Sequence, residues 1–271
     1  MYKNKNGKVI LIGAGPGDPE LLTLKAARFL QCADVVLTDR LVSKEILETH
    51  VNVNAEVIYV GKQCRRGNST PQQTINELLV EYALQNKLVV RLKGGDVSIF
   101  SNILDELQTL VENNISYEIV PGITAAMGAA AYSGIPLTAR NHATAVRFLT
   151  YYKSDVVADE KWNELAQTDD TLVFYMSAET ASTIAEKLAA ANINRNKKMA
   201  VIEQATTPFQ TVQVYDVYED LKKLQQAAFK SPSLIIIGSV VSLHQQFAWL
   251  QNSNTASEYF TWEFEKVKER A

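Results

Sequence analysis

The chain has few cysteines and histidines, which excludes two kinds of site. Its 271 residues include only Cys32 and Cys64, too few for a disulfide scaffold and unsuitably spaced for zinc. Cys32 falls among the apolar positions of a predicted helix, so we expect a buried structural thiol there. The three histidines, His50, His142 and His244, show no metal-ligand spacing, and we predict no metal site.

An excess of positive charge and long apolar runs are also missing. The 27 basic residues are balanced by 30 acidic ones, giving a net charge of −3 and no basic field for nucleic acid. No apolar run approaches the ~18 residues of a membrane span, so we predict no membrane partner. Residues 1–8 are polar and lead directly into a strand, without a visible signal peptide. These features favour a globular protein of the cytoplasm.

Helical and strand patterns alternate along the chain, which predicts an α/β fold whose sheets carry helices on both faces. Two α/β domains fit the chain length better than one sheet of ten strands, and we expect the domain change close to Pro121-Gly122-Ile123. We place them at 1–122 and 123–250, with a tail at 251–271 whose role cannot be read. The predicted strands are 9–12, 34–38, 56–60, 88–92, 117–120, 146–151, 171–176, 199–203 and 233–238. Predicted helices lie near 22–33, 75–82, 103–111, 179–190 and 217–228.

The first of three glycine-rich turns follows the strand Val9–Ile12 and reads Gly13-Ala14-Gly15-Pro16-Gly17-Asp18-Pro19. A buried parallel strand that ends in such a turn leaves a backbone-lined crevice at its carboxyl end, where α/β proteins bind ligands. Asp18 is suited to cap the next helix, with Pro19 at its first position. The dinucleotide fingerprint needs glycine where Asp18 stands, so the turn does not favour a nicotinamide cofactor.

Two further segments repeat this pattern. Arg91-Leu92-Lys93-Gly94-Gly95-Asp96 ends a second buried strand, and its glycines would let a flat ligand approach the main chain. Asp96 could accept hydrogen bonds from such a ligand, although a purely structural connection would explain the glycines too. Pro121-Gly122-Ile123 then opens a stretch of small residues, including Ala129-Ala130-Ala131, which indicates a helix packed closely against another helix or a ligand.

Taken in order, these segments resemble the tetrapyrrole methylase family over about residues 8–250. The matching motifs are Gly13-Ala14-Gly15-Pro16-Gly17-Asp18-Pro19-Glu20-Leu21-Leu22-Thr23, Asp39-Arg40-Leu41-Val42-Ser43, Val60-Gly61-Lys62, Arg91-Leu92-Lys93-Gly94-Gly95-Asp96, Pro121-Gly122-Ile123-Thr124-Ala125, Gly134-Ile135-Pro136-Leu137-Thr138 and Tyr175-Met176.

The resemblance implies two α/β domains with S-adenosylmethionine held in the cleft between them, S-adenosylhomocysteine as a product, and a homodimer. By matching position, the family's cofactor contacts fall on Pro16, Gly94, Gly95, Asp96, Ile99, Thr124, Ala125, Met176 and Ala205.

The similarity is greatest to the family branch that transfers two methyl groups to uroporphyrinogen III, giving precorrin-2 for siroheme or cobalamin synthesis. In that branch Asp39 matches the presumed proton acceptor and Lys62 the presumed proton donor. A lysine there could instead stabilise negative charge. Arg140 matches a residue that contacts the tetrapyrrole substrate, and its guanidinium suits a carboxylate.

The chain departs from the family pattern after Asp96. Asn102 stands where a substrate-facing arginine is usual, and Gln63 replaces another arginine. These departures leave two alternatives open, a methyltransferase acting on a later precorrin and a cofactor-binding homologue without turnover. A protein-modifying relative such as diphthine synthase fits the substrate-entry segments less well.

Overall fold

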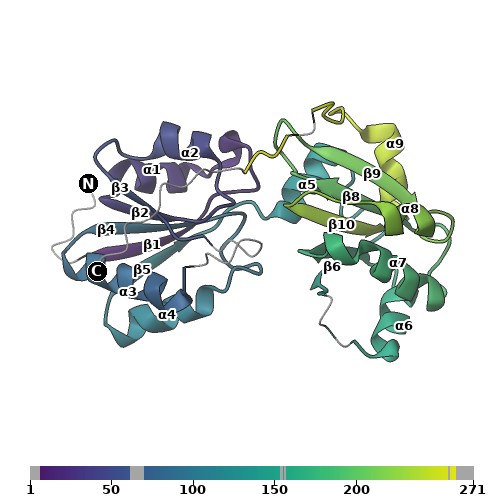
Figure 1. Ribbon diagram of the computed structural model, residues 1–271, viewed down its shortest axis with the longest axis horizontal. Helices are drawn as coiled ribbons and strands as arrows, with labels where there is room; N and C mark the ends of the chain where they lie inside the picture. Colours follow the sequence, from purple (N-terminus) through teal and green to yellow (C-terminus); the bar gives the residue numbers. More distant parts are fainter. Residues whose placement is uncertain (1–6, 62–69, 153–154, 156, 256, 261–271) are drawn as a thin grey trace. The chain divides into compact units, whose positions relative to one another are not determined.

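The computed structural model describes residues 7–61, 70–152, 155, 157–255 and 257–260, which form two compact units. The first unit comprises the described residues up to Thr124 together with Phe260, and the second comprises Ala125–Tyr259. Each unit contains a five-stranded sheet flanked by helices (Figure 1). We describe the units separately.

The first unit alternates strands and helices. Its elements are β1 (Lys8–Gly13), the 3-10 helix η1 (Pro19–Leu21), α1 (Leu24–Cys32), β2 (Val35–Thr38), α2 (Lys44–His50), β3 (Glu56–Tyr59), α3 (Gln72–Leu84), β4 (Leu88–Lys93), α4 (Ile103–Glu112) and β5 (Ser116–Val120).

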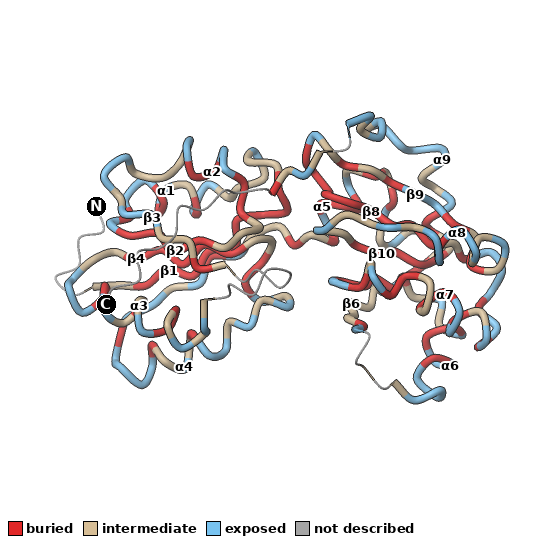
Figure 2. Tube along the Cα trace, viewed as in Figure 1, coloured by how far each residue is buried: buried red, intermediate tan, exposed pale blue. Residues whose placement is uncertain are grey.

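The sheet of this unit is parallel, with the strand order β3-β2-β4-β1-β5. Connections that run toward β3 and connections that run toward β5 place their helices on opposite faces, since such crossovers are right-handed. Accordingly α1 and α2 cover one face, and α3 and α4 cover the other (Figure 1). The central strands are buried on both faces (Figure 2), as their continuous apolar runs predict.

The turn after β1 begins as the sequence predicts. Asp18 caps η1 by accepting a hydrogen bond from the Glu20 N–H at 2.8 Å, and Pro19 occupies the first helical position. One expectation was wrong. Cys32 is exposed, because it is the last residue of α1 and lies outside the apolar face formed by Ala26, Phe29 and Leu30.

The second unit contains both parallel and antiparallel pairs. Its elements are α5 (Ala125–Ser133), β6 (Val146–Thr150), α6 (Asp159–Gln167), β7 (Thr171–Tyr175), η2 (Ala178–Thr180), α7 (Ala181–Ala190), β8 (Lys198–Glu203), β9 (Thr211–Asp216), α8 (Leu221–Gln226), β10 (Ser233–Gly238), η3 (Ser239–Leu243) and α9 (His244–Phe247).

The strand order in this sheet is β6-β7-β10-β8-β9. β6 and β7 are parallel, whereas β10 runs antiparallel to β7 and β8, and β9 antiparallel to β8. Helices α6, α7 and α8 pack on one face through a core that includes Trp162, Ile184 and Leu188. The small-residue helix α5 contacts β10, so its alanines permit a close approach to a strand.

The segment from His244 to Tyr259 forms hydrogen bonds with α5 and with the connection between β8 and β9. Trp249 Nε1 donates to the Ala131 carbonyl at 2.8 Å, and His244 Nδ1 lies 2.5 Å from the Ser133 carbonyl, at the end of α5. Further along, the Gln204 side chain donates to the Ser257 carbonyl and accepts from the Tyr259 N–H. The described residues of the predicted tail up to Tyr259 are therefore part of this unit.

Among the described residues, no helix is both long enough and apolar enough to cross a membrane.

Candidate active site

Three glycines at the carboxyl ends of β1, β4 and β5 bring main chain against main chain in the first unit. We call Gly13, Gly95 and Gly122 the glycine junction. A Cβ at Gly13 would lie 2.6 Å from the Gly95 carbonyl oxygen and 2.7 Å from the Gly122 nitrogen, and one at Gly122 would lie 2.6 Å from the Gly13 oxygen. The approach is possible only without side chains at Gly13 and Gly122, and it leaves Gly13 buried and Gly95 and Gly122 partly exposed.

The turns after β1 and β4 are joined directly to one another. Gly15 and Gly95 exchange two backbone hydrogen bonds, with N···O distances of 3.1 and 2.7 Å. Both residues have positive φ values, +84° and +70°, which a residue with a side chain rarely adopts. The sequence motif containing Pro16 and the motif containing Gly94 and Asp96 therefore form one surface.

Asp96 ties this surface to the start of the third motif. Its Oδ2 accepts a hydrogen bond from the Gly122 N–H at 2.9 Å, and its Oδ1 accepts from the N–H and hydroxyl of Ser98. The side chain is buried, so these bonds make Asp96 a structural tie within the proposed cofactor surface. Packing also requires glycine at position 94, because a Cβ there would lie 2.8 Å from Leu41. Ile99 lies in the same loop and is partly buried.

Asp39, the predicted proton acceptor, follows β2 and belongs to a cluster of buried charges. Arg91 Nη2 donates to Asp39 Oδ1 at 2.7 Å, and Arg91 Nε donates to Glu106 Oε1 at 2.9 Å. Lys93 Nζ lies 3.1 Å from both oxygens of Glu106. We call Asp39, Arg91, Lys93 and Glu106 the charge cluster. The Asp39 side chain is 26% exposed, whereas the other three are at most 5% exposed.

Burial acts differently on the two cations. Burial disfavours the charge of Arg91, but Asp39 and Glu106 outweigh it and raise the pKa of Arg91. Burial and the neighbouring Arg91 lower the pKa of Lys93, against the opposing effect of Glu106. Arg91 therefore remains the fixed positive charge beside Asp39.

Sequence reasoning missed Arg91 and Glu106 as site residues, although it contained a signal. Arg91 and Lys93 are two residues apart in an otherwise apolar strand, so both point to the same buried face. Two buried cations require a buried anion, which Glu106 supplies from α4.

In the second unit, the predicted residues gather at one end of the sheet, where central strands terminate. Met176 follows β7 and Ala205 follows β8, and both strands end beside the start of β10. The Tyr175 hydroxyl accepts a hydrogen bond from the Ala126 N–H at 3.2 Å, which brings Ala125 to the same end of the sheet.

Three residues at this end of the sheet have a strained backbone. Met176, Gln204 and Thr206 have φ values of +55°, +47° and +65°, in a region that residues with side chains rarely occupy. Such strain is commonly found at functional sites. Met176 remains 52% exposed, and its sulfur accepts a hydrogen bond from the Tyr152 hydroxyl.

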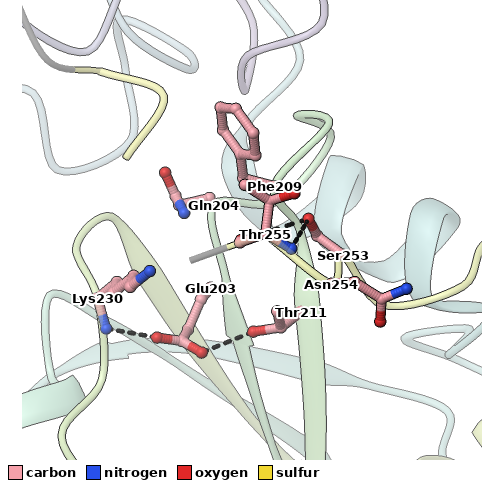
Figure 3. A pocket seen from close by; sticks show the side chains of 8 residues that line it. All are labelled: Glu203, Gln204, Phe209, Thr211, Lys230, Ser253, Asn254 and Thr255. Carbon is pink, nitrogen blue, oxygen red and sulfur yellow. Dashed lines mark hydrogen bonds between the residues drawn. The ribbon is translucent and has the colours of Figure 1, made fainter. Parts of the chain in front are cut away.

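A small cavity of about 180 Å³ lies at this end of the sheet, beside the end of β8 (Figure 3). Its lining residues are Glu203, Gln204, Phe209, Thr211, Lys230, Ser253, Asn254 and Thr255. The Glu203 carboxylate already accepts hydrogen bonds from the Thr211 hydroxyl, the Gln213 amide and the Lys230 N–H. The carboxylate therefore ties β8 to its neighbours.

The remaining predicted residues are placed as follows. Thr124 is buried at the end of the first unit, and Arg140 is exposed in the connection between α5 and β6. Lys62 and Gln63 lie outside the described residues. Asn102 precedes α4 with φ 52° and ψ 43°, a left-handed conformation that asparagine adopts more readily than arginine. In the portion of the chain that the structure covers, no three His, Cys, Asp or Glu side chains form a metal-binding group.

Comparison with known proteins agrees with this arrangement. The family model described as Tetrapyrrole (Corrin/Porphyrin) Methylases matches residues 8–219. A siroheme synthase of Pseudoalteromonas atlantica is 49% identical over 248 residues, which are 92% of this chain and 53% of that protein. The chain thus spans about half the length of the curated relatives it matches.

Two solved structures have similar folds. A uroporphyrin-III C-methyl transferase from Thermus thermophilus, complexed with S-adenosyl homocysteine, is 34% identical with a TM-score of 0.72, covering 88% of this chain and all of that one. A cobalt precorrin-4 methyltransferase is 26% identical with a TM-score of 0.76, covering 86% of this chain and 95% of that one. The chain belongs to the tetrapyrrole methylase family.

Proposed function

We propose that the chain is an S-adenosylmethionine-dependent C-methyltransferase that transfers two methyl groups to uroporphyrinogen III, giving precorrin-2. The observation that carries the proposal is the partly exposed Asp39 carboxylate, held by a buried arginine in the same unit as the glycine turns that follow β1 and β4. The match to a uroporphyrin-III C-methyl transferase over that protein's whole length supports this reading.

The residues present suit the cofactor. Its adenine, ribose and amino-acid groups can all hydrogen-bond to main chain, and the partly exposed Gly94 and Gly95 have no side chains that would keep a ligand away from it. We assign cofactor contacts to Pro16, the Gly94–Asp96 backbone, Ile99, Thr124, Ala125, Met176 and Ala205. When bound, S-adenosylmethionine supplies an electrophilic methyl group on a sulfonium that leaves as S-adenosylhomocysteine.

The chain's own residues then align the reactants and move a proton. Fixed orientation of the nucleophilic ring carbon accounts for a large share of the acceleration, since methyl transfer needs little covalent assistance. After the ring carbon gains the methyl group, the ring system carries a positive charge and loses a proton from another position, which we assign to the Asp39 carboxylate. Arg140 is exposed and suited to bind a substrate carboxylate, and Lys62 remains the predicted proton donor.

Transfer to a later precorrin is the second candidate, favoured by Asn102 and by the fold shared with a cobalt precorrin-4 methyltransferase. The left-handed backbone conformation at position 102, however, explains the asparagine without any change of substrate. We also infer a homodimer from the family, which light scattering after gel filtration tests directly.

The deciding experiment is an anaerobic assay with uroporphyrinogen III and S-adenosylmethionine, followed by mass spectrometry of the tetrapyrrole. We expect a product heavier by two methyl groups, formed much more slowly by Asp39→Asn. Asp169→Asn, at an exposed aspartate between α6 and β7, is the matched control and should keep wild-type activity. Binding of S-adenosylhomocysteine without methyl transfer would point to later precorrins, and absence of both would overturn the proposal.

A further inference from the structure

Arg91 fixes the position of Asp39 through an unusually complete set of bonds. Besides the bonds to Asp39 and Glu106, its Nη1 donates to the carbonyls of Leu37 at 3.4 Å and Leu92 at 3.3 Å. Every nitrogen of the guanidinium is therefore engaged. Because Leu37 is in β2 and Leu92 in β4, the plane of the guanidinium is fixed relative to two strands of the sheet.

The positive and negative charges of the charge cluster balance. A contribution to folding stability alone does not explain why the cluster is present. Two cations and two anions lie together, and three of these side chains are removed from water. Desolvation can offset or exceed the attraction within a buried ion pair, so apolar residues of similar shape would serve a purely structural purpose as well. What ions provide that apolar side chains cannot is a carboxylate held at a defined place near the surface.

We propose that Arg91 is a positioning residue for the proton transfer, and that Glu106 sets the orientation of Arg91. This inference rests on the proposed function, in which Asp39 is the proton acceptor. Arg91 engages Asp39 Oδ1 and directs Oδ2 toward the substrate. A proton bound elsewhere on the methylated, positively charged ring system passes to Oδ2, and the electron pair of the bond that held it stays in the ring system and neutralises the charge.

A double-mutant cycle tests this coupling. The variants are Arg91→Met, Asp39→Asn and the pair, measured in single turnovers with both substrates saturating. Arg91→Met leaves Lys93 and Glu106 as a balanced buried pair, so the variant should fold. We expect it to lower the rate about 10- to 100-fold, while KM and the Kd for S-adenosylhomocysteine change less than about twofold. In the Asp39→Asn background the same change should cost less than about threefold.

Arg147→Met is the matched control. Arg147 also bridges two carboxylates, Glu164 and Asp170, but it belongs to the second unit and is none of the residues proposed to bind or act on the reactants. We expect an unchanged rate. Arg91→Lys provides a second probe if Arg91→Met does not fold, because it keeps the charge and loses the planar fork. It should give an intermediate rate with KM unchanged.

The outcomes separate the inference from the proposed function. Wild-type turnover is measured first, and an inactive wild-type chain overturns the proposed function together with the catalytic purpose of Arg91. An active wild-type chain in which the costs at Arg91 and Asp39 simply add overturns the positioning alone. Equal losses in kcat and in cofactor affinity would also overturn it, since they would show general disturbance of the fold.

Discussion

The side-chain amide of Asn252 pairs with both backbone polar groups of Val212. Asn252 Oδ1 accepts from the Val212 N–H at 2.7 Å, and Nδ2 donates to the Val212 carbonyl at 3.0 Å. Val212 lies in β9, the edge strand of the second sheet, whose ladder partner on its other side is β8. One side chain thus satisfies two groups that an edge strand would otherwise leave to solvent.

Asn252→Ala should therefore weaken the second unit. We expect the free energy of unfolding in urea to fall by about 1 kcal/mol, because two hydrogen bonds are lost at a partly exposed site. Asn254→Ala changes an exposed asparagine in the same segment and should stay within about 0.5 kcal/mol of wild type. Equal stability of the two variants would contradict the anchoring.

The glycine junction predicts a severe effect of a single methyl group. Gly13→Ala places a Cβ 2.6 Å from one main-chain atom and 2.7 Å from another, and neither can move without shifting a strand. We expect a loss of about 3 kcal/mol or more in unfolding free energy.

Gly238→Ala is the control for that change. A Cβ there meets its nearest neighbour at 3.5 Å, and φ is 162°, within the extended range. This substitution should be neutral or slightly stabilising. Comparable melting temperatures for Gly13→Ala and wild type would show that the three strand ends lie further apart than described.

Asp96→Asn tests the tie between the second and third motifs. All three partners of Asp96 donate hydrogen bonds, and an amide can accept only through its one oxygen. We expect stability to fall by about 2–3 kcal/mol in chemical unfolding. Asp169→Asn again serves for comparison, and a wild-type value for Asp96→Asn would argue against the tie.

Acid should remove the contribution of Asp216. The N–H groups of Tyr218 and Glu219, together with the Lys198 ammonium, lower the pKa of Asp216 below its ordinary 3.8. A carboxylate whose pKa is lower in the folded state stabilises the protein above the unfolded pKa, and this stabilisation is lost as pH falls through the folded pKa. Asp216→Asn should thus be less stable than wild type at pH 7, and the difference should shrink below pH ~3.8. A difference independent of pH would contradict this assignment.

The elements predicted best from the sequence are the strands in which nearly every residue is buried. The runs in β1 and β4 are buried on both faces, so every residue carries the same apolar signal, and the glycine turns mark their ends. Sequence reasoning missed α2, α6 and β9. α2 has only seven residues, too few to establish a helical period. β9 buries Val212 and Tyr215, which are not an even number of residues apart, so the alternation expected of a strand is absent.

The candidate site divides in the same way. Asp39 and the glycine turns were found because strand ends are visible in the sequence. The bond between Arg91 and Asp39 joins residues 52 positions apart, and its existence depends on β2 and β4 being neighbours. Sequence periodicity gives the face of a strand but not the order of strands. The antiparallel pairing of β10 escaped prediction for that reason as well.

The glycine junction also limits how this part of the molecule can diverge. A peptide group offers the same N–H and C=O whichever residue carries it, and no larger residue fits at Gly13 or Gly122. Point mutations can destroy this surface but cannot retune it. New ligand preferences in such a fold have to arise in neighbouring segments that carry side chains, and the stretch from Val97 to Glu106 is one where this chain already differs from its family.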